Sequence, residues 1–160
     1  MGPPSLKALE KALKDVTRLG IDSAPVIYFI DQNPRYVALV DELFQRVASG
    51  SLTAVTSTIT ITEVLIHPLR QGHHELRDSY LELLLGADNL STLAVDAGMA
   101  AMAADMRARY TMRTPDALQI ACAIAAQCDA FLTNDKRLKA VTEIPILVLD
   151  ELLDREGGSG

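Results

Sequence analysis

The sequence lacks long apolar runs, a secretory leader and a myristoylation signal. No apolar stretch approaches the roughly 18 residues that a membrane-spanning helix needs. No charged N-terminal segment leads into an apolar run, as a secretory signal would require. The opening Met-Gly is followed by Leu6 where a myristoylation signal requires Ser or Thr. We therefore expect a soluble, cytoplasmic protein that makes no contact with a membrane.

Cysteine and histidine are also scarce. The two cysteines, Cys122 and Cys128, lie six positions apart, and the first falls within an apolar helical stretch. This context favours buried free thiols over a disulfide or a metal-binding pair. The three histidines, His67, His73 and His74, form no HExxH motif and are not joined by a paired-cysteine motif, so the sequence does not indicate a zinc site.

The composition is that of a globular domain. The chain has 160 residues, 49% of them apolar, and shows no internal repeat. This length suits one domain with a full hydrophobic core. The net charge of −6 repels nucleic acid unless the charge is unevenly distributed or offset by bound cations.

Helical and strand patterns alternate along the chain, as in an α/β fold. An N-terminal amphipathic helix and lead-in occupy residues 1–19, the main domain spans 20–153, and a Gly/Ser-rich flexible tail covers 154–160. Asn33-Pro34 is expected to open a helix that Gly50 ends, and His67-Pro68 to bend or end another. Strands are predicted at about 17–22, 52–57, 130–133 and 146–149, and further helices at about 75–85, 96–110 and 115–127.

Two aspartates follow predicted strands. Asp22 stands in Ile21-Asp22-Ser23-Ala24-Pro25, and Asp135 stands in Leu132-Thr133-Asn134-Asp135-Lys136. In open parallel sheets, sites form beyond the carboxyl ends of the strands, where the loops diverge. The first strand, Arg18-Leu19-Gly20-Ile21, is less apolar than a central strand usually is.

Two further acids fall on predicted helices. Glu63 lies between Thr62 and Val64 on a largely apolar helix, and Asp116 follows Thr114-Pro115. Each has an ordinary explanation when taken alone. A glutamate on a helix is most often exposed, and Thr-Pro-Asp is a typical helix start, in which Asp complements the helix dipole.

Taken together and in this order, the four acidic segments resemble the signature of the PIN-domain nucleases, in particular the VapC-type toxins of bacterial toxin–antitoxin pairs. The resemblance extends from about Gly20 to Leu153. It implies an α/β fold of the PIN-like three-layer type, with a short, mainly parallel central sheet flanked by helices. It also implies catalytic, metal-binding roles for four acids and supporting roles for three polar neighbours. The acids are Asp22, Glu63, Asp116 and Asp135, and the neighbours are Ser23, Thr133 and Asn134.

The chemistry of such an acidic cluster favours a divalent cation. Two carboxylates about 4 Å apart repel each other by roughly 4 kcal/mol at an effective dielectric near 20. Mg²⁺ and Mn²⁺ prefer hard oxygen ligands and can orient a phosphate and activate a water molecule. The resemblance implies metal-dependent hydrolysis of RNA, a cognate antitoxin as partner, and a homodimer. Many members of the family carry a further aspartate at the position of Arg137, so we expect a second metal site that is weaker or that gains ligands only when substrate arrives.

Basic residues lie close to the acids in the sequence. Arg107, Arg109 and Arg113 precede Asp116, and Lys136, Arg137 and Lys139 follow Asp135. Arg113, Lys136 and Arg137 are candidates for contacts to RNA phosphates. The same residues are equally explained as the solvated ends of helices.

The segment after the first aspartate has conflicting signals. Residues 25–30, Pro-Val-Ile-Tyr-Phe-Ile, have strand propensity because they are β-branched and aromatic. The family resemblance instead implies a helix here, and Ser23 and Pro25 suit its first turn. We predict the helix.

Two other functional classes remain open at this stage. A Mg²⁺-dependent phosphotransfer or acceptor domain would use one aspartate at a strand end as nucleophile, with no need for Glu63 or Asp116. A catalytically silent PIN-type module would bind RNA or protein without cleavage, and the complete set of four acids argues against it.

Overall fold

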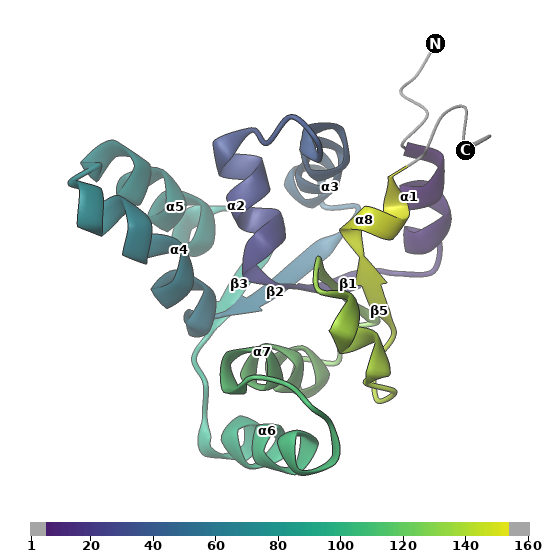
Figure 1. Cartoon of the computed structure of the whole chain (residues 1–160). Coiled ribbons are helices and arrows are strands. Elements are labelled where there is room, and N and C mark those ends of the chain that lie inside the picture. The colour runs from purple at the N-terminus through teal and green to yellow at the C-terminus, as the bar shows by residue number, and fades with distance from the viewer. Residues whose placement is uncertain (1–5, 154–160) are drawn as a thin grey trace.

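The computed structural model describes residues 6–153, so the predicted tail at 154–160 lies outside the described residues. Five strands form a single parallel sheet in the order β3-β2-β1-β4-β5 (Figure 1). The strands are β1 (Arg18–Ile21), β2 (Thr53–Ser57), β3 (Leu90–Leu93), β4 (Ala130–Thr133) and β5 (Ile146–Val148). The predicted α/β fold with a parallel central sheet is confirmed.

Helices cover both faces of this sheet (Figure 1). On one face α7 packs against the strands and α6 packs on α7, while α1, α2, α3 and α8 lie on the other. The helices α4 and α5 pair beside β3. The helical segments are α1 (Leu6–Leu13), α2 (Ser23–Asp31), α3 (Val37–Ser49), α4 (Thr58–Gln71), α5 (His74–Gly86), α6 (Ala97–Arg109), α7 (Thr114–Ala125), the 3₁₀ helix η1 (Lys136–Ala140) and α8 (Leu149–Leu152).

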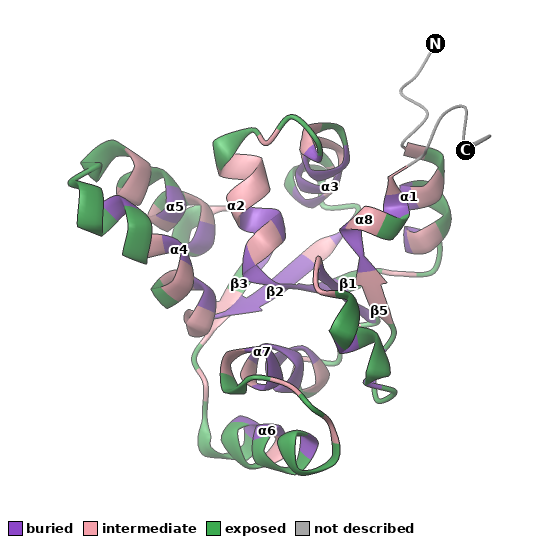
Figure 2. Cartoon of the chain, viewed as in Figure 1, coloured by how far each residue is buried: buried purple, intermediate pink, exposed green. Residues whose placement is uncertain are grey.

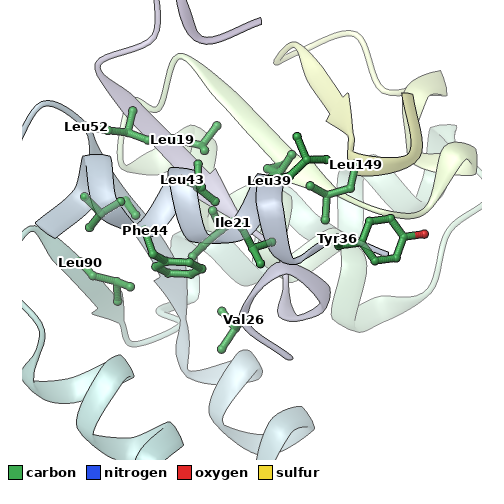
Figure 3. Packing of buried hydrophobic residues seen from close by; sticks show 14 of the residues in the cluster. Leu19, Ile21, Val26, Tyr36, Leu39, Leu43, Phe44, Leu52, Leu90 and Leu149 are labelled. Atoms are coloured by element: carbon green, nitrogen blue, oxygen red, sulfur yellow. The ribbon is translucent and has the colours of Figure 1, made fainter. Parts of the chain in front are cut away.

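The core divides according to the alternation of side chains along each strand. In β1, Leu19 and Ile21 face the α3 side, where they pack with Leu39, Leu43 and Phe44 (Figure 3). Phe131 of β4 points to the opposite face, into the cluster formed with α6 and α7. Figure 2 shows that the central strands are buried, whereas the outward faces of α5 and α6 are exposed. The N-terminal helix α1 joins this core through Leu9 and Leu13.

The helix predicted after Asp22 is present as α2, so the family resemblance was right here and local strand propensity was wrong. The predicted start of α3 at Asn33 was wrong. The Asn33 side chain accepts from the Arg35 N–H (2.9 Å) and forms a turn, and the helix begins at Val37. Gly50 ends α3 with φ of 85°, as predicted.

Pro68 does not end its helix, so this part of the prediction that the helix bends or ends at His67-Pro68 was wrong. Helix α4 continues to Gln71 and stops at Gly72, whose φ is 69°. Pro68 lacks one backbone N–H, and its ring is buried within the fold. Sequence patterns also missed β3 and η1, and they extended the last strand to Leu149, which begins α8.

Both cysteines are free thiols, and Cys122 is buried as predicted. Cys128 is half-buried. Burial raises the pKa of Cys122 to about 11 and that of Cys128 to about 12, so both thiols stay protonated at neutral pH. Within residues 6–153, no helix has the length and apolar character needed to cross a membrane.

Candidate active site

The four predicted acids line one pocket at the carboxyl end of the sheet. Asp22 follows β1, and Asp135 follows β4, the neighbouring strand. Glu63 reaches the pocket from α4 and Asp116 from the first turn of α7. The pocket has a volume of about 240 Å³, enough for several water molecules. Its walls also include Ser23, Thr133 and Asn134, together with Ala24, Tyr28 and Arg113.

Asp22 is buried and hydrogen-bonded through both of its carboxylate oxygens. Its side chain is only 9% exposed and caps α2, where Oδ1 accepts from the Ser23 N–H (2.8 Å). Oδ2 accepts from the Thr133 hydroxyl (2.8 Å), so one carboxylate ties β1, α2 and β4 together. Burial raises the pKa of Asp22 from 3.8 to about 6. The two hydrogen bonds oppose this rise, and the charges of Asp116 and Glu63 add to it.

The raised pKa of Asp22 predicts a pH-dependent stability in the absence of metal. Between about pH 4 and pH 6 Asp22 binds more protons in the folded protein than in the unfolded chain, so the contribution of Asp22 to the free energy of unfolding falls as pH rises and levels off above pH 6. A pKa change from 3.8 to about 6 corresponds to at most about 3 kcal/mol. Urea unfolding in chelator should show that Asp22→Asn removes this slope and is the more stable protein at pH 7.5. Identical slopes in both proteins would contradict the assignment.

Glu63 is oriented by a buried polar network beneath the pocket. The Ser23 hydroxyl donates to Glu63 Oε1 at 2.6 Å. Gln119 of α7 lies below, where its amide donates to the Thr60 hydroxyl (2.6 Å) and its carbonyl accepts from the Ser57 hydroxyl (2.7 Å). Among the described residues, no buried side-chain nitrogen or oxygen is left without a partner. The network fixes α4 against α7, and so it fixes the two helix-borne acids relative to each other.

Replacing Gln119 with Leu should reduce both stability and site order. The change leaves the Ser57 and Thr60 hydroxyls without their amide partner in a buried position, which costs about 1–3 kcal/mol. Chemical unfolding should show a loss of this size at every pH between 5 and 8. Gln45→Leu, at an exposed position of α3 outside this network, serves as the matched control. A Gln119→Leu protein as stable as the wild type would mean that the network is not a structural element of the site.

Asp116 and Asp135 are each paired with an arginine. The Arg113 Nε donates to Asp116 Oδ2 (3.2 Å), and Asp116 is itself 7% exposed. Asp135 accepts from the Arg137 Nε at Oδ1 (3.0 Å) and from its terminal nitrogen at Oδ2 (2.8 Å). The Arg137 side-chain hydrogen bond lowers the pKa of Asp135 despite its partial burial. Asp135 is therefore ionised at neutral pH, with both oxygens bound to the arginine.

Asn134 lines the pocket, and its side-chain hydrogen bonds go to Tyr28 and Asp150 rather than to the four acids that it was expected to support. Its amide donates to the Tyr28 hydroxyl (3.2 Å), and its carbonyl oxygen accepts from the Asp150 N–H (2.9 Å). The Tyr28 ring stacks on Tyr36 with centroids 4.4 Å apart. Sequence reasoning missed Tyr28, Gln119 and Thr60, because nothing in the local sequence marks a residue whose role depends on a contact with a distant segment.

The predicted basic residues separate into two groups. Arg107, Arg113 and Arg137 line a second pocket of about 220 Å³ beside the acids, whereas Lys136 lines neither pocket. Arg109 and Lys139 form ion pairs elsewhere, with Asp105 and Glu143 and with Glu151. Three arginines therefore lie beside the acids, fewer than the six basic residues that lie close to them in the sequence.

The donor set suits a divalent cation, although the carboxylates must move to share one. Carboxylate oxygens are the ligands that Mg²⁺ and Mn²⁺ prefer, and the uncompensated burial of Asp22 is the condition that a cation relieves. As arranged within residues 6–153, no three acidic, histidine or cysteine side chains lie close enough to hold a metal ion. Both Asp135 oxygens accept from Arg137, so a cation at Asp135 would compete with this arginine.

The comparisons with known proteins identify the family and the fold of this chain. Residues 21–144 match the family model of the PIN domain, and the chain therefore belongs to the PIN-domain family. The predicted family is confirmed. A search of curated protein sequences gives no match.

Solved structures share the fold at low sequence identity. VapBC2 from Rickettsia felis, bound to a DNA fragment from their promoter, is 17% identical with a TM-score of 0.66, covering 82% of this chain and 98% of its own. Mycobacterium tuberculosis VapC20, a sarcin-ricin loop cleaving toxin, is 13% identical with a TM-score of 0.64, covering 81% and 99%. A toxin–antitoxin complex from Klebsiella pneumoniae is 15% identical with a TM-score of 0.61, covering 83% and 98%.

Proposed function

We propose that this protein is a metal-dependent endoribonuclease that hydrolyses RNA phosphodiester bonds and acts as the toxin of a toxin–antitoxin pair. The observation that carries the proposal is the meeting of four carboxylates from β1, α4, α7 and the β4 end in one open pocket. Membership of the PIN family and the similarity to a sarcin-ricin loop cleaving toxin support the same activity.

Asp22, Glu63, Asp116 and Asp135 would hold Mg²⁺ or Mn²⁺ in this proposal. When bound, the cation supplies an activated water and neutralises charge on the scissile phosphate. The protein positions two of these ligands through hydrogen bonds. Thr133 and the Ser23 N–H hold Asp22, while the Ser23 hydroxyl holds Glu63. Arg113 and Arg137 lie where their guanidinium groups can donate hydrogen bonds to an RNA phosphate.

The proposed partners are a cognate antitoxin protein and a second copy of this chain, in the cytoplasm. The solved structures that share the fold include toxin–antitoxin complexes from several bacteria, which supports an antitoxin partner. The net charge of −6 suits association with a basic segment of such a partner.

The test is cleavage of a panel of structured RNAs with Mg²⁺, with Mn²⁺ and with chelator. We expect cleavage only when a divalent cation is present. Attack by water in heavy-oxygen solvent should place one solvent oxygen on a 5′-phosphate in a single turnover and leave a 3′-hydroxyl on the other product. Mass spectrometry of both ends reads this result. A cyclic phosphate or a trapped aspartyl-phosphate would overturn the proposed mechanism.

A further inference from the structure

A second pocket adjoins the acidic one and shares Arg113, Asp116 and Asp135 with it. Its other walls include Arg107 and Arg137, and we name it the arginine pocket. We propose that it binds a phosphate group next to the scissile one, and that Arg113 and Arg137 transfer from Asp116 and Asp135 to this phosphate when a cation binds the acids. This inference rests on the proposed function and specifies how its site recognises the backbone of the substrate.

In both arginine–carboxylate pairs the guanidinium group is exposed and free to change partners. The Arg137 side chain is 77% exposed and that of Arg113 is 65% exposed, so neither guanidinium is fixed by packing. The Asp135 side chain is 27% exposed, so water and salt screen its pair with Arg137 and keep that pair weak. The Asp116 side chain is only 9% exposed, so a cation that displaces Arg113 must itself compensate this carboxylate. A divalent cation can do so, because it carries twice the charge of a guanidinium group.

Arg107 gives the pocket a charge that does not depend on the acids. Its Nε donates to the Met112 carbonyl (2.9 Å), and one terminal nitrogen donates to the Thr114 hydroxyl (2.9 Å). Both partners are neutral oxygens, so the positive charge is not cancelled by this pairing. A guanidinium carries five N–H donors, and the remaining ones are available to a phosphate oxygen.

The exchange couples cation binding to phosphate binding. Without a cation, Arg113 and Arg137 neutralise Asp116 and Asp135, and the arginine pocket offers mainly Arg107. With a cation on the acids, both arginines lose their partners and three guanidinium groups face the pocket. Coupling between two ligands is reciprocal, so an anion in the arginine pocket must also tighten cation binding.

The first test is calorimetric titration of Mg²⁺ into protein without RNA. Arg137→Gln removes a competing partner and a repelling charge, so Mg²⁺ should bind about two- to fivefold more tightly than to the wild type. The matched control is Arg77→Gln, since Arg77 also pairs with an aspartate, Asp78, at 2.9 Å on α5. Equal affinities for Arg137→Gln and the wild type would overturn the proposed competition.

The second test follows the exchange directly, by NMR of the arginine Nε–H groups in ¹⁵N-arginine-labelled protein. Addition of Mg²⁺ should shift the Nε–H signals of Arg113 and Arg137. Sulfate, a tetrahedral dianion, is then added and should shift both signals again, together with the signal of Arg107. Sulfate should bind more tightly in Mg²⁺ than in chelator, and the Arg113→Gln/Arg137→Gln protein should lose that difference. Equal sulfate affinities of the wild type in Mg²⁺ and in chelator would overturn the proposed coupling.

These measurements do not require cleavage, so the two proposals can fail separately. If Mg²⁺ binds the wild type and Asp22→Asn equally, the cation site of the proposed function is wrong. If Mg²⁺ requires Asp22 but neither the Arg113 nor the Arg137 signal responds to it, only the partner exchange is wrong.

Discussion

Asp22→Asn, Glu63→Gln, Asp116→Asn and Asp135→Asn each reduce RNA cleavage by about 100- to 1,000-fold or more, if the four carboxylates act as proposed. Each change keeps the shape of the side chain and removes one negative oxygen ligand from the pocket. Single-turnover cleavage of one defined RNA, at a fixed Mg²⁺ concentration, measures the effect. Asp22→Asn should show the largest loss, because this side chain touches β1, α2 and β4 at once.

Stability separates a catalytic role for these acids from a structural one. In chelator at pH 7.5 the Asp22 carboxylate is ionised in a buried position near two other acids, so the amide should not lower the melting temperature. Asp78→Asn and Glu82→Gln make the same chemical changes at exposed positions on α5 and should leave cleavage unchanged. Near-normal cleavage by any of the four site variants would remove that residue from the mechanism.

The positions of the strand-end acids were predictable from sequence because they depend on local order along the chain. Asp22 and Asp135 directly follow buried segments, and neighbouring parallel strands bring their carboxyl ends to the same edge of the sheet. Glu63 and Asp116 were predicted only through the family resemblance. Their local context is that of ordinary helical acids, and it is the packing of α4 and α7 that turns them toward Asp22.

The residues that hold the acids in place were less predictable, because their roles depend on contacts between distant segments. Gln119 lies on an apolar helix, and its sequence neighbourhood does not reveal that Ser57 and Thr60 face it. The pairing of Arg137 with Asp135 is local in sequence, but the choice between a solvated side chain and a closed ion pair requires the geometry. The early start expected for α3 fails for a related reason, since Asn33 caps a turn in place of the helix.

The low apolar content of the first strand also has its explanation in packing. Gly20 lies on the central strand β1, on the face that meets α7. A β-carbon at this position would stand 2.6 Å from the Ala123 Cβ and 3.1 Å from Phe131 Cδ1. Both neighbours are buried, so α7 can approach the sheet this closely only because residue 20 has no side chain.

Gly20→Ala should therefore destabilise the protein and misplace an acid of the site. Overpacking of a buried position costs about 1–3 kcal/mol. The lower chain entropy of alanine in the unfolded state returns about 0.4–1 kcal/mol of this. Gly20→Val should cost more, because its larger side chain meets the same two neighbours. Since α7 also carries Asp116, we expect cleavage to fall along with the melting temperature.

Two variants make the Gly20 experiment specific. Gly86→Ala introduces the same methyl group at a position with no atom within 4 Å, and it should change the free energy of unfolding by no more than about 0.5 kcal/mol. Ala123→Gly removes the atom that the new methyl group would strike. In a double-mutant cycle, Gly20→Ala should therefore cost less in the Ala123→Gly background than in the wild type. Additive effects of the two substitutions, or a Gly20→Ala protein as stable as Gly86→Ala, would show that contact between residue 20 and Ala123 does not limit how closely α7 approaches β1.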